Sequence, residues 1–267
     1  MMAWIVFDID GTLKPYLSSI PKSTISAIEK LKQAGHDIAI ATGREYQETK
    51  ETANLLGIDY LICCGGSQMI FKNEMIYDKY LDTDYMNRVI SYFETTKTPY
   101  IIFNDNQCCS SYFPKRYFAF FKLLLPLFKL NIIKFGSTAG VFFQKVMSTK
   151  LTSKDEVINF KTKKIAFFKK AKNISIFEPF HIYNRKILHM VEFECKEEGI
   201  KLLKQNKNQK VVVFGDGFND LSMFKYADLS IAMGNATSIL KQNADYITKD
   251  SHKNGIMAAC EYYDFFK

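Results

Sequence analysis

The sequence has little of what several common kinds of functional site require. Its six cysteines include adjacent pairs at residues 63–64 and 108–109, but none forms a C-x-x-C unit of the kind found in zinc and redox sites. The four histidines show no ligand or triad spacing, and there is no G-x-S-x-G motif. These absences argue against a zinc site and against a serine or cysteine nucleophile. We expect reduced, mostly buried thiols in a cytoplasmic protein.

Segments that direct a chain to a membrane are absent as well. The first residues run straight into an apolar stretch, without the basic region and apolar segment of a secretion signal. The most apolar segment, residues 117–130, contains Lys122, Pro126 and Lys129 and is too short to span a bilayer. We expect no membrane partner and interpret this segment as a helix. Its apolar face could belong to a domain core or to a dimer contact, so a monomer and a homodimer are both open.

Charge is unevenly distributed along the chain. Of the net charge of +8, residues 83–190 carry 18 Lys and Arg against 6 Asp and Glu, or +12, which leaves −4 for the rest. An acidic body with a basic insertion suits an enzyme that draws anionic substrates towards a metal, although surface lysines can also serve solubility alone. Dense lysines at residues 161–164 and 169–172 leave nucleic-acid binding as an alternative. We do not expect a nucleic-acid partner, because no recognised motif accompanies the charge.

Apolar periodicity in the first third of the chain alternates between strand and helix. The predicted order is strand 4–9, helix 23–34, strand 37–41, helix 45–56 and strand 60–64, followed by a hairpin of residues 69–71 and 75–77. This rhythm predicts parallel strands with helices on both faces of the sheet.

The pattern changes near residue 82 and returns near residue 191. Beyond that point we expect strands at 192–195, 210–214, 229–232 and 244–248, with helices at 199–204 and 221–226. The predicted fold class is α/β. A Rossmann-like parallel-sheet core is built from residues 1–82 and 191–267, and an α+β domain of residues 83–190 is inserted into it.

Acidic residues follow two of the predicted core strands. Asp8 and Asp10 come after the first strand, and Asp216 and Asp220 come after the strand at 210–214. Open α/β sheets place their active sites at the carboxyl ends of the strands. Hard carboxylate oxygens that converge on one point suggest a magnesium ion.

Four short motifs, in order, resemble those of the haloacid dehalogenase superfamily. They are DIDGTL at residues 8–13, ATGR at 41–44, a lysine ahead of a helix, and GDGFND at 215–220. The closest resemblance is to the Cof-type phosphatases, which carry a large α+β cap (the C2B type) between the second and third motifs. The resemblance covers nearly the whole core and implies a phosphatase whose inserted domain selects the substrate.

The resemblance assigns separate roles to the first two acids. Asp8 is the expected nucleophile, which would attack phosphorus and form an aspartyl-phosphate. Asp10 would protonate the leaving oxygen and later activate water, while its backbone carbonyl faces the metal. Asp216 would complete the Mg²⁺ site with Asp8 and the Asp10 carbonyl, and Asp220 would support it. An aspartate that only begins a helix is the alternative for Asp220.

The expected phosphate contacts come from three further segments. Thr42 and the Gly43 amide follow a strand and precede a helix, and Arg44 would contact the substrate or pair with an acid. Lys196, three residues before Gly199, would neutralise Asp8 and the phosphate, with Lys201 as the competitor.

Three other positions leave their roles open. Asn219 would bind phosphate or orient Asp8. Asn235 would close the core near the metal loop or be a plain turn residue. At residues 64–66 the sequence Cys-Gly-Gly departs from the Asn-Gly-Ala common in the family, which puts substrate contacts of the Cys64 loop in doubt.

These residues predict a Mg²⁺-dependent phosphatase acting on a small phosphorylated metabolite, with a sugar or polyol phosphate as the first substrate class. Two alternatives stay open. A phosphomutase would use the same acid pair, and a non-catalytic protein could bind an anion or nucleic acid through the basic insertion.

Overall fold

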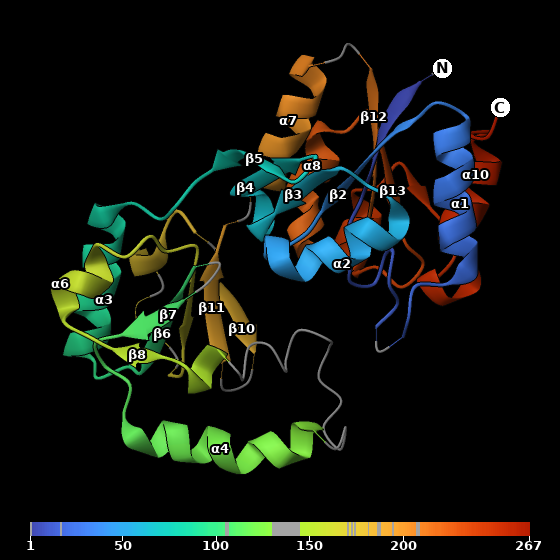
Figure 1. Cartoon of the computed structure of the whole chain (residues 1–267). Helices are drawn as coiled ribbons and strands as arrows, with labels where there is room; N and C mark the ends of the chain where they lie inside the picture. Colours follow the sequence, from blue (N-terminus) through green and yellow to red (C-terminus); the bar gives the residue numbers. More distant parts are fainter. Residues whose placement is uncertain are drawn as a thin grey trace. The chain divides into compact units, whose positions relative to one another are not determined.

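The computed structural model divides the chain into two compact units (Figure 1). The first comprises Met1–Asp78 and Glu194–Lys267, and the second is Lys79–Phe193. The predicted boundaries, after residue 82 and before residue 191, lie within four residues of these. The structure describes residues 2–16, 18–104, 107–129, 145–169, 171, 173, 175–180, 182–185, 188–193, 195–206 and 209–267.

The first unit is built on an eight-stranded sheet with the order β14-β13-β12-β1-β2-β3-β4-β5. Its strands are β1 (Ala3–Phe7), β2 (Asp37–Ala41), β3 (Tyr60–Cys63), β4 (Gln68–Phe71), β5 (Glu74–Asp78), β12 (Lys210–Gly215), β13 (Leu229–Ala232) and β14 (Tyr246–Ile247). The six strands from β14 to β3 are parallel, and the hairpin β4–β5 joins them antiparallel. The predicted parallel sheet and the predicted hairpin are therefore confirmed.

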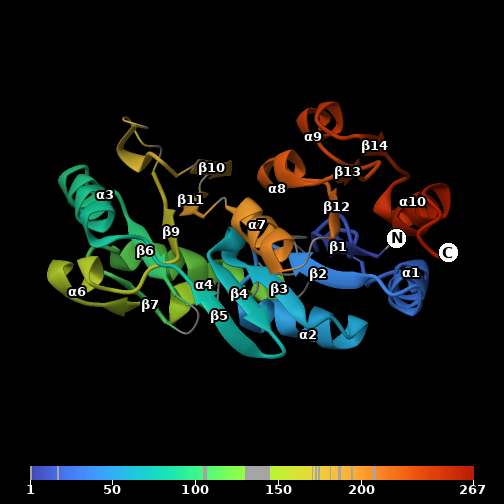
Figure 2. The same ribbon diagram turned by 90° about the horizontal axis from the view of Figure 1, so that it is seen from above.

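Helices cover both faces of this sheet (Figure 2). They are α1 (Lys22–Gln33), α2 (Tyr46–Leu56), α7 (Lys196–Asn206), α8 (Leu221–Tyr226), α9 (Ser238–Gln242) and α10 (Gly255–Tyr262). Alternate residues of β1 point into opposite layers, because successive side chains of a strand face opposite sides. Ile5 and Phe7 pack with α1, α2 and α10, whereas Trp4 and Val6 pack with α7, α8 and α9. This alternation explains why the whole strand is apolar.

The second unit is a six-stranded sheet with the order β10-β11-β9-β6-β7-β8, antiparallel except for the pair β7–β8. Its elements are α3 (Thr83–Thr95), β6 (Tyr100–Phe103), β7 (Cys108–Ser110), α4 (Lys115–Lys129), β8 (Lys150–Leu151), α6 (Lys154–Ile158), β9 (Lys164–Phe167), β10 (Ile182–Arg185) and β11 (Leu188–Glu192). Helices α3 and α6 lie side by side (Figure 1). The predicted α/β fold with an inserted α+β unit is confirmed.

Two predicted elements on either side of residue 195 differ from the structure. The strand predicted at 192–195 is wrong: β11 ends at Glu192 and belongs to the sheet of the second unit. The helix predicted to begin at Gly199 begins at Lys196 instead. Its first turn, Lys-Glu-Glu, is polar and gives no apolar periodicity to mark it.

The apolar segment at residues 117–130 lies largely in α4, with residue 130 outside the described residues. Phe118 packs in the core of the second unit, where its ring lies 4.8 Å from that of Phe113. Leu123 on the same helix is 74% exposed. In the part of the chain that the structure describes, no helix has the length and apolar character needed to cross a bilayer. Five of the six cysteines are buried, in keeping with the predicted mostly buried thiols.

Candidate active site

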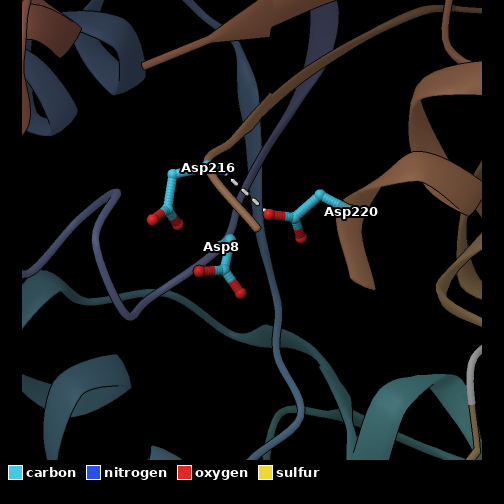
Figure 3. A group of neighbouring side chains, drawn as sticks. All are labelled: Asp8, Asp216 and Asp220. Atoms are coloured by element: carbon cyan, nitrogen blue, oxygen red, sulfur yellow. Dashed lines mark hydrogen bonds between the residues drawn. The ribbon is translucent and has the colours of Figure 1, made fainter. Parts of the chain in front are cut away.

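Three buried carboxylates gather at the carboxyl edge of the parallel sheet (Figure 3). Asp8 follows β1 and Asp216 follows the neighbouring strand β12, with Phe7 and Phe214 paired in register. Asp220 comes from the turn after β12. One ligand oxygen from each of the three side chains lies within 4.8 Å of the others. The adjacent parallel strands thus bring together acids that are more than 200 positions apart in the sequence.

Lys196 supplies the positive charge inside this cluster. Its side chain is fully buried, and its Nζ donates to Asp8 Oδ1 at 2.8 Å and to Asp220 Oδ1 at 2.6 Å. Burial alone would lower the pKa of Lys196, but the carboxylates of Asp220 and Asp8 raise it above its usual value. The lysine is therefore charged in the folded protein. Lys201, the competing candidate, pairs with Glu198 and its side chain is 38% exposed.

Asp220 holds the loop that carries Asp216. One of its oxygens accepts from Lys196, while the other accepts from the backbone N–H groups of Asp216 and Gly217, both at 2.9 Å. These contacts occupy both oxygens of a fully buried carboxylate. Asp220 thus ties the Lys196 ammonium to the loop that carries Asp216, with three of its four lone-pair sites in use.

For the remaining two acids, the charged form is unfavourable in the folded protein. Burial raises the pKa of Asp8 well above its usual value, with Lys196 opposing the shift and Asp220 and Asp216 adding to it. Burial and the neighbouring Asp220 raise the pKa of Asp216 to about 7. A divalent cation would relieve this repulsion, and hard carboxylate oxygens are the donors that Mg²⁺ prefers. The residues therefore fit a magnesium ion.

Three donors surround the carboxylate of Asp216. Thr12 Oγ1 donates to Oδ1 at 3.3 Å, and Tyr16 Oη donates to Oδ2 at 3.0 Å. Asn235 Nδ2 lies 3.4 Å from Oδ2 and donates to the Gly11 carbonyl at 2.9 Å. Asn235 therefore ties the first acidic loop to the second, which is more than a turn asparagine does.

The contact of Tyr16 was missed by sequence reasoning. It depends on the path of the loop between β1 and α1, which no apolar periodicity or motif spacing encodes. Thr12 was part of a recognised motif but had been given no role.

Asp10 and Arg44 form a bidentate ion pair. Arg44 Nε donates to Asp10 Oδ2 at 2.8 Å, and Nη2 donates to Oδ1 at 2.5 Å. The guanidinium is 8% exposed and the Asp10 side chain is 40% exposed. Of the two roles considered for Arg44, pairing with a nearby acid is the one that the structure displays.

The other predicted phosphate contacts lie on the same edge of the sheet or beside the acids. Thr42 directly follows β2, is 1% exposed, and its Oγ1 accepts from the Arg44 N–H at 3.2 Å. Gly43 lies between them and is half-buried. Asn219 is half-buried in the short 3₁₀ turn of residues 218–220. Among the described residues, no hydrogen bond joins Asn219 to Asp8.

The Cys-Gly-Gly loop at residues 64–66 sets the start of α7. The Cys195 N–H donates to the Gly65 carbonyl at 2.7 Å, immediately before Lys196. Gly66 has a φ of 101°, and a Cβ at this position would lie 2.1 Å from the Cys195 carbonyl oxygen. This close backbone approach requires glycine. The loop thus lies directly against the residue that precedes the buried lysine.

Comparison with known proteins gives a consistent result. A family model described as haloacid dehalogenase-like hydrolase matches residues 5–259. A Bacillus subtilis protein named "Putative phosphatase YkrA" is 28% identical over 268 residues, which cover 98% of each chain. The phosphoglycolate phosphatase of Methanobrevibacter smithii is 23% identical, with 97% of each chain covered. The 5-amino-6-(5-phospho-D-ribitylamino)uracil phosphatase YcsE of B. subtilis is 25% identical, covering 97% of this chain and 94% of its own.

Solved structures share the fold over nearly the whole chain. A protein of Geobacillus kaustophilus aligns with a TM-score of 0.76 and 23% identity, covering 99% of this chain and 100% of its own. A sugar phosphatase described as haloacid dehalogenase subclass IIB aligns with a TM-score of 0.72 and 23% identity, with the same coverage. At 23% identity, this similarity shows that the fold is shared and no more than that.

Proposed function

Because the chain belongs to the haloacid dehalogenase-like hydrolases, we propose that it is a Mg²⁺-dependent phosphatase that hydrolyses a small phosphorylated metabolite through an aspartyl-phosphate. The family inferred from four short motifs is confirmed. The observation that supports the proposal is the buried group of Asp8, Lys196 and Asp216, in which two carboxylates lie close together and the lysine ammonium donates to one of them.

Asp8 is the proposed nucleophile. Its Oδ1 accepts from Lys196, and Oδ2 accepts no hydrogen bond from the described residues. One oxygen is thus fixed by a cation while the other is free to attack phosphorus. Lys196 would also offset the charge of the incoming phosphate, since phosphoryl transfer depends mainly on positioning and charge stabilisation.

Asp8 and Asp216 are the proposed side-chain ligands of Mg²⁺, with the Asp10 carbonyl as a third and Asp220 as support. Bound there, the ion would offset negative charge on the phosphoryl oxygens. Asp216 has four lone-pair sites on two oxygens, and the contacts from Thr12, Tyr16 and Asn235 leave room for a ligand bond.

Asp10 is the proposed acid and base. It would give a proton to the leaving oxygen and then take one from the attacking water. Arg44 fixes the orientation of this carboxylate through two hydrogen bonds in one plane. The hydroxyl of Thr42, the amide of Gly43 and the side chain of Asn219 are the proposed further contacts of the phosphate.

A sugar or polyol phosphate is the proposed substrate class. Two relatives named above act, by their names, on phosphoglycolate and on a phosphorylated ribityl compound, and one solved relative is described as a sugar phosphatase. The inserted unit, whose segment from residue 83 to 190 carries a charge of +12, would serve as the cap that selects among such anions.

The test is a screen of phosphate monoesters with and without Mg²⁺, with release of inorganic phosphate as the readout. We expect turnover that chelation abolishes, and a loss of at least about 10³-fold in Asp8→Asn and in Asp10→Asn. Asp59→Asn, at an exposed position of the same unit, is the matched control and should retain full activity. Ordinary phosphate release by Asp8→Asn would refute the nucleophile assignment.

The same screen separates the alternatives. A phosphomutase would return the phosphoryl group to a sugar and release no net phosphate from a monoester. A protein that binds anions or nucleic acid through its basic unit would show salt-dependent binding without turnover.

A further inference from the structure

We propose that Tyr16 is a positioning residue that orients Asp216 for Mg²⁺ through its hydroxyl. This inference rests on the proposed metal site and assigns a role to a residue outside the four motifs. Tyr16 Oη donates to Asp216 Oδ2 at 3.0 Å, the shortest of the three side-chain contacts to this carboxylate.

The backbone after Asp8 explains how Tyr16 reaches a residue 200 positions away. The chain turns back on itself there, because the Leu13 N–H donates to the Asp8 carbonyl and the Lys14 N–H donates to the Ile9 carbonyl. The Gly11 N–H closes the turn on the Lys14 carbonyl at 2.8 Å. Pro15, which is buried, then restricts the backbone just before Tyr16. The turn that presents Asp8 thus also presents the phenol.

Tyr16 is more exposed than buried. It is 56% exposed, so its placement beside a buried acid is not needed to fill a core. What it supplies is a polar donor to a buried carboxylate. A phenol hydroxyl there can hold one oxygen of Asp216 while Thr12 holds the other, which fixes the rotation of the carboxylate.

A fixed carboxylate matters for metal binding. Groups that hydrogen-bond a metal ligand set its orientation, and their loss typically weakens metal affinity by about 10–100-fold. Tyr16 is one of three such groups at Asp216, so the lower end of that range applies. The contact predicts an effect on Mg²⁺ affinity rather than on the reaction at saturating metal.

The experiment compares Mg²⁺ binding by calorimetry in the whole purified protein, stripped of metal, as wild type and as Tyr16→Phe. The substitution removes one oxygen from an exposed ring, so the thermal midpoint without metal should stay within about 2 °C. We expect the Kd for Mg²⁺ to rise about tenfold. Tyr262→Phe, at a ring that is 65% exposed near the C-terminus, should bind as wild type does.

A second readout uses activity as a function of Mg²⁺ concentration. For Tyr16→Phe the concentration for half-activation should rise about tenfold, while kcat at saturating Mg²⁺ stays within about threefold of wild type. An unchanged Kd in Tyr16→Phe, with wild type binding Mg²⁺, overturns the role of Tyr16 and leaves the proposed function standing. Failure of the wild type itself to bind Mg²⁺ overturns both.

Discussion

Lys196 is the residue whose removal would disturb the site most. It is the buried cation between Asp8 and Asp220, and both carboxylates lie within hydrogen-bonding distance of its Nζ. A buried ion pair gains little over an apolar packing, but losing one partner leaves uncompensated charge in the interior. Two buried acids would then face each other with no cation between them.

Lys196→Met should therefore lower both stability and turnover. We expect the free energy of unfolding, measured with denaturant in the presence of a chelator, to fall by about 3–5 kcal/mol. Phosphatase activity should fall about 10²–10³-fold, because the charge next to the nucleophile is lost. Lys201→Met, which removes a partly exposed cation paired with Glu198, should leave stability close to that of the wild type, because surface ion pairs contribute little. Equal effects of the two substitutions would contradict the role of Lys196.

The role of Arg44 can be tested by measuring kcat and KM separately. Its two nitrogens grip both oxygens of Asp10, and lysine cannot reproduce this planar pairing. Arg44→Lys should lower kcat about ten- to a hundredfold, since misplacing a reacting group by about 1 Å has effects of this size. KM should stay within about twofold. A rise in KM with kcat unchanged would instead show that Arg44 binds the substrate. Lys22→Arg, at an exposed position of the first unit, is the control and should leave both constants unchanged.

For single residues, the sequence predicted the side chains that strand ends place in the site. It missed the contacts that depend on the path of a loop. Asp8 and Asp216 could be paired in advance because each directly follows an apolar strand of a parallel sheet. Two roles stayed open for Arg44, substrate contact and pairing with an acid, because motif spacing does not determine the direction of a long side chain. Tyr16 was missed because its hydrogen bond depends on a turn held by backbone groups, which carry no residue-specific signal.

Helix α7 shows how an element is set by a neighbouring loop. Its first residue is Lys196, and the preceding Cys195 is hydrogen-bonded to the Gly65 carbonyl. The polar first turn gives no periodicity of its own, so the helix start could not be read from the sequence. The start is fixed by the contact with the loop at residues 64–66, which is a tertiary effect.

Gly66→Ala should displace the start of α7. The new Cβ would overlap the Cys195 carbonyl at a φ of 101°, so the backbone must shift. We expect a loss of about 2–4 kcal/mol in the free energy of unfolding, from the unfavourable φ and the overlap together, and a fall in kcat through movement of Lys196. Gly35→Ala is a close control. It has a φ of 85°, and its Cβ would meet only Met2 atoms at 3.8 Å. A loss of about 1–2 kcal/mol with normal kcat is expected there, and a similar kcat in both variants would contradict the prediction.

The strand predicted at 192–195 shows a second limit of prediction from local sequence. A short segment that alternates polar and apolar residues, here Glu-Phe-Glu-Cys, can pair with either of two sheets, and local sequence does not choose between them. In the structure this region ends β11, whose residues pair with β9 and β10 of the second unit. The choice is made by long-range pairing. By contrast, β1 and β12 were predictable because both are buried on two faces and are therefore apolar, β12 from its second residue on.

For the molecule as a whole, the acidic cluster couples stability to pH and to the metal. The pKa of Asp8 and that of Asp216 are raised in the folded protein, the latter to about 7, whereas an unfolded aspartate titrates near about 3.9. Between these values the folded state holds more protons than the unfolded state, so its stability without metal falls as pH rises through this window. Below about pH 4 both states are protonated and the effect vanishes.

Magnesium should reverse this dependence, because only the ionised carboxylates bind it and binding releases their protons. For Asp216 alone, a pKa of about 7 implies that affinity for Mg²⁺ is about tenfold weaker at pH 6 than at pH 8. The rise in thermal midpoint on adding millimolar Mg²⁺ should accordingly be larger at pH 8 than at pH 6. Thermal melts at both pH values, at constant ionic strength and with Asp216→Asn as the control that responds little at either, would measure it. Equal shifts at the two pH values would mean that Asp216 is already ionised before the metal arrives.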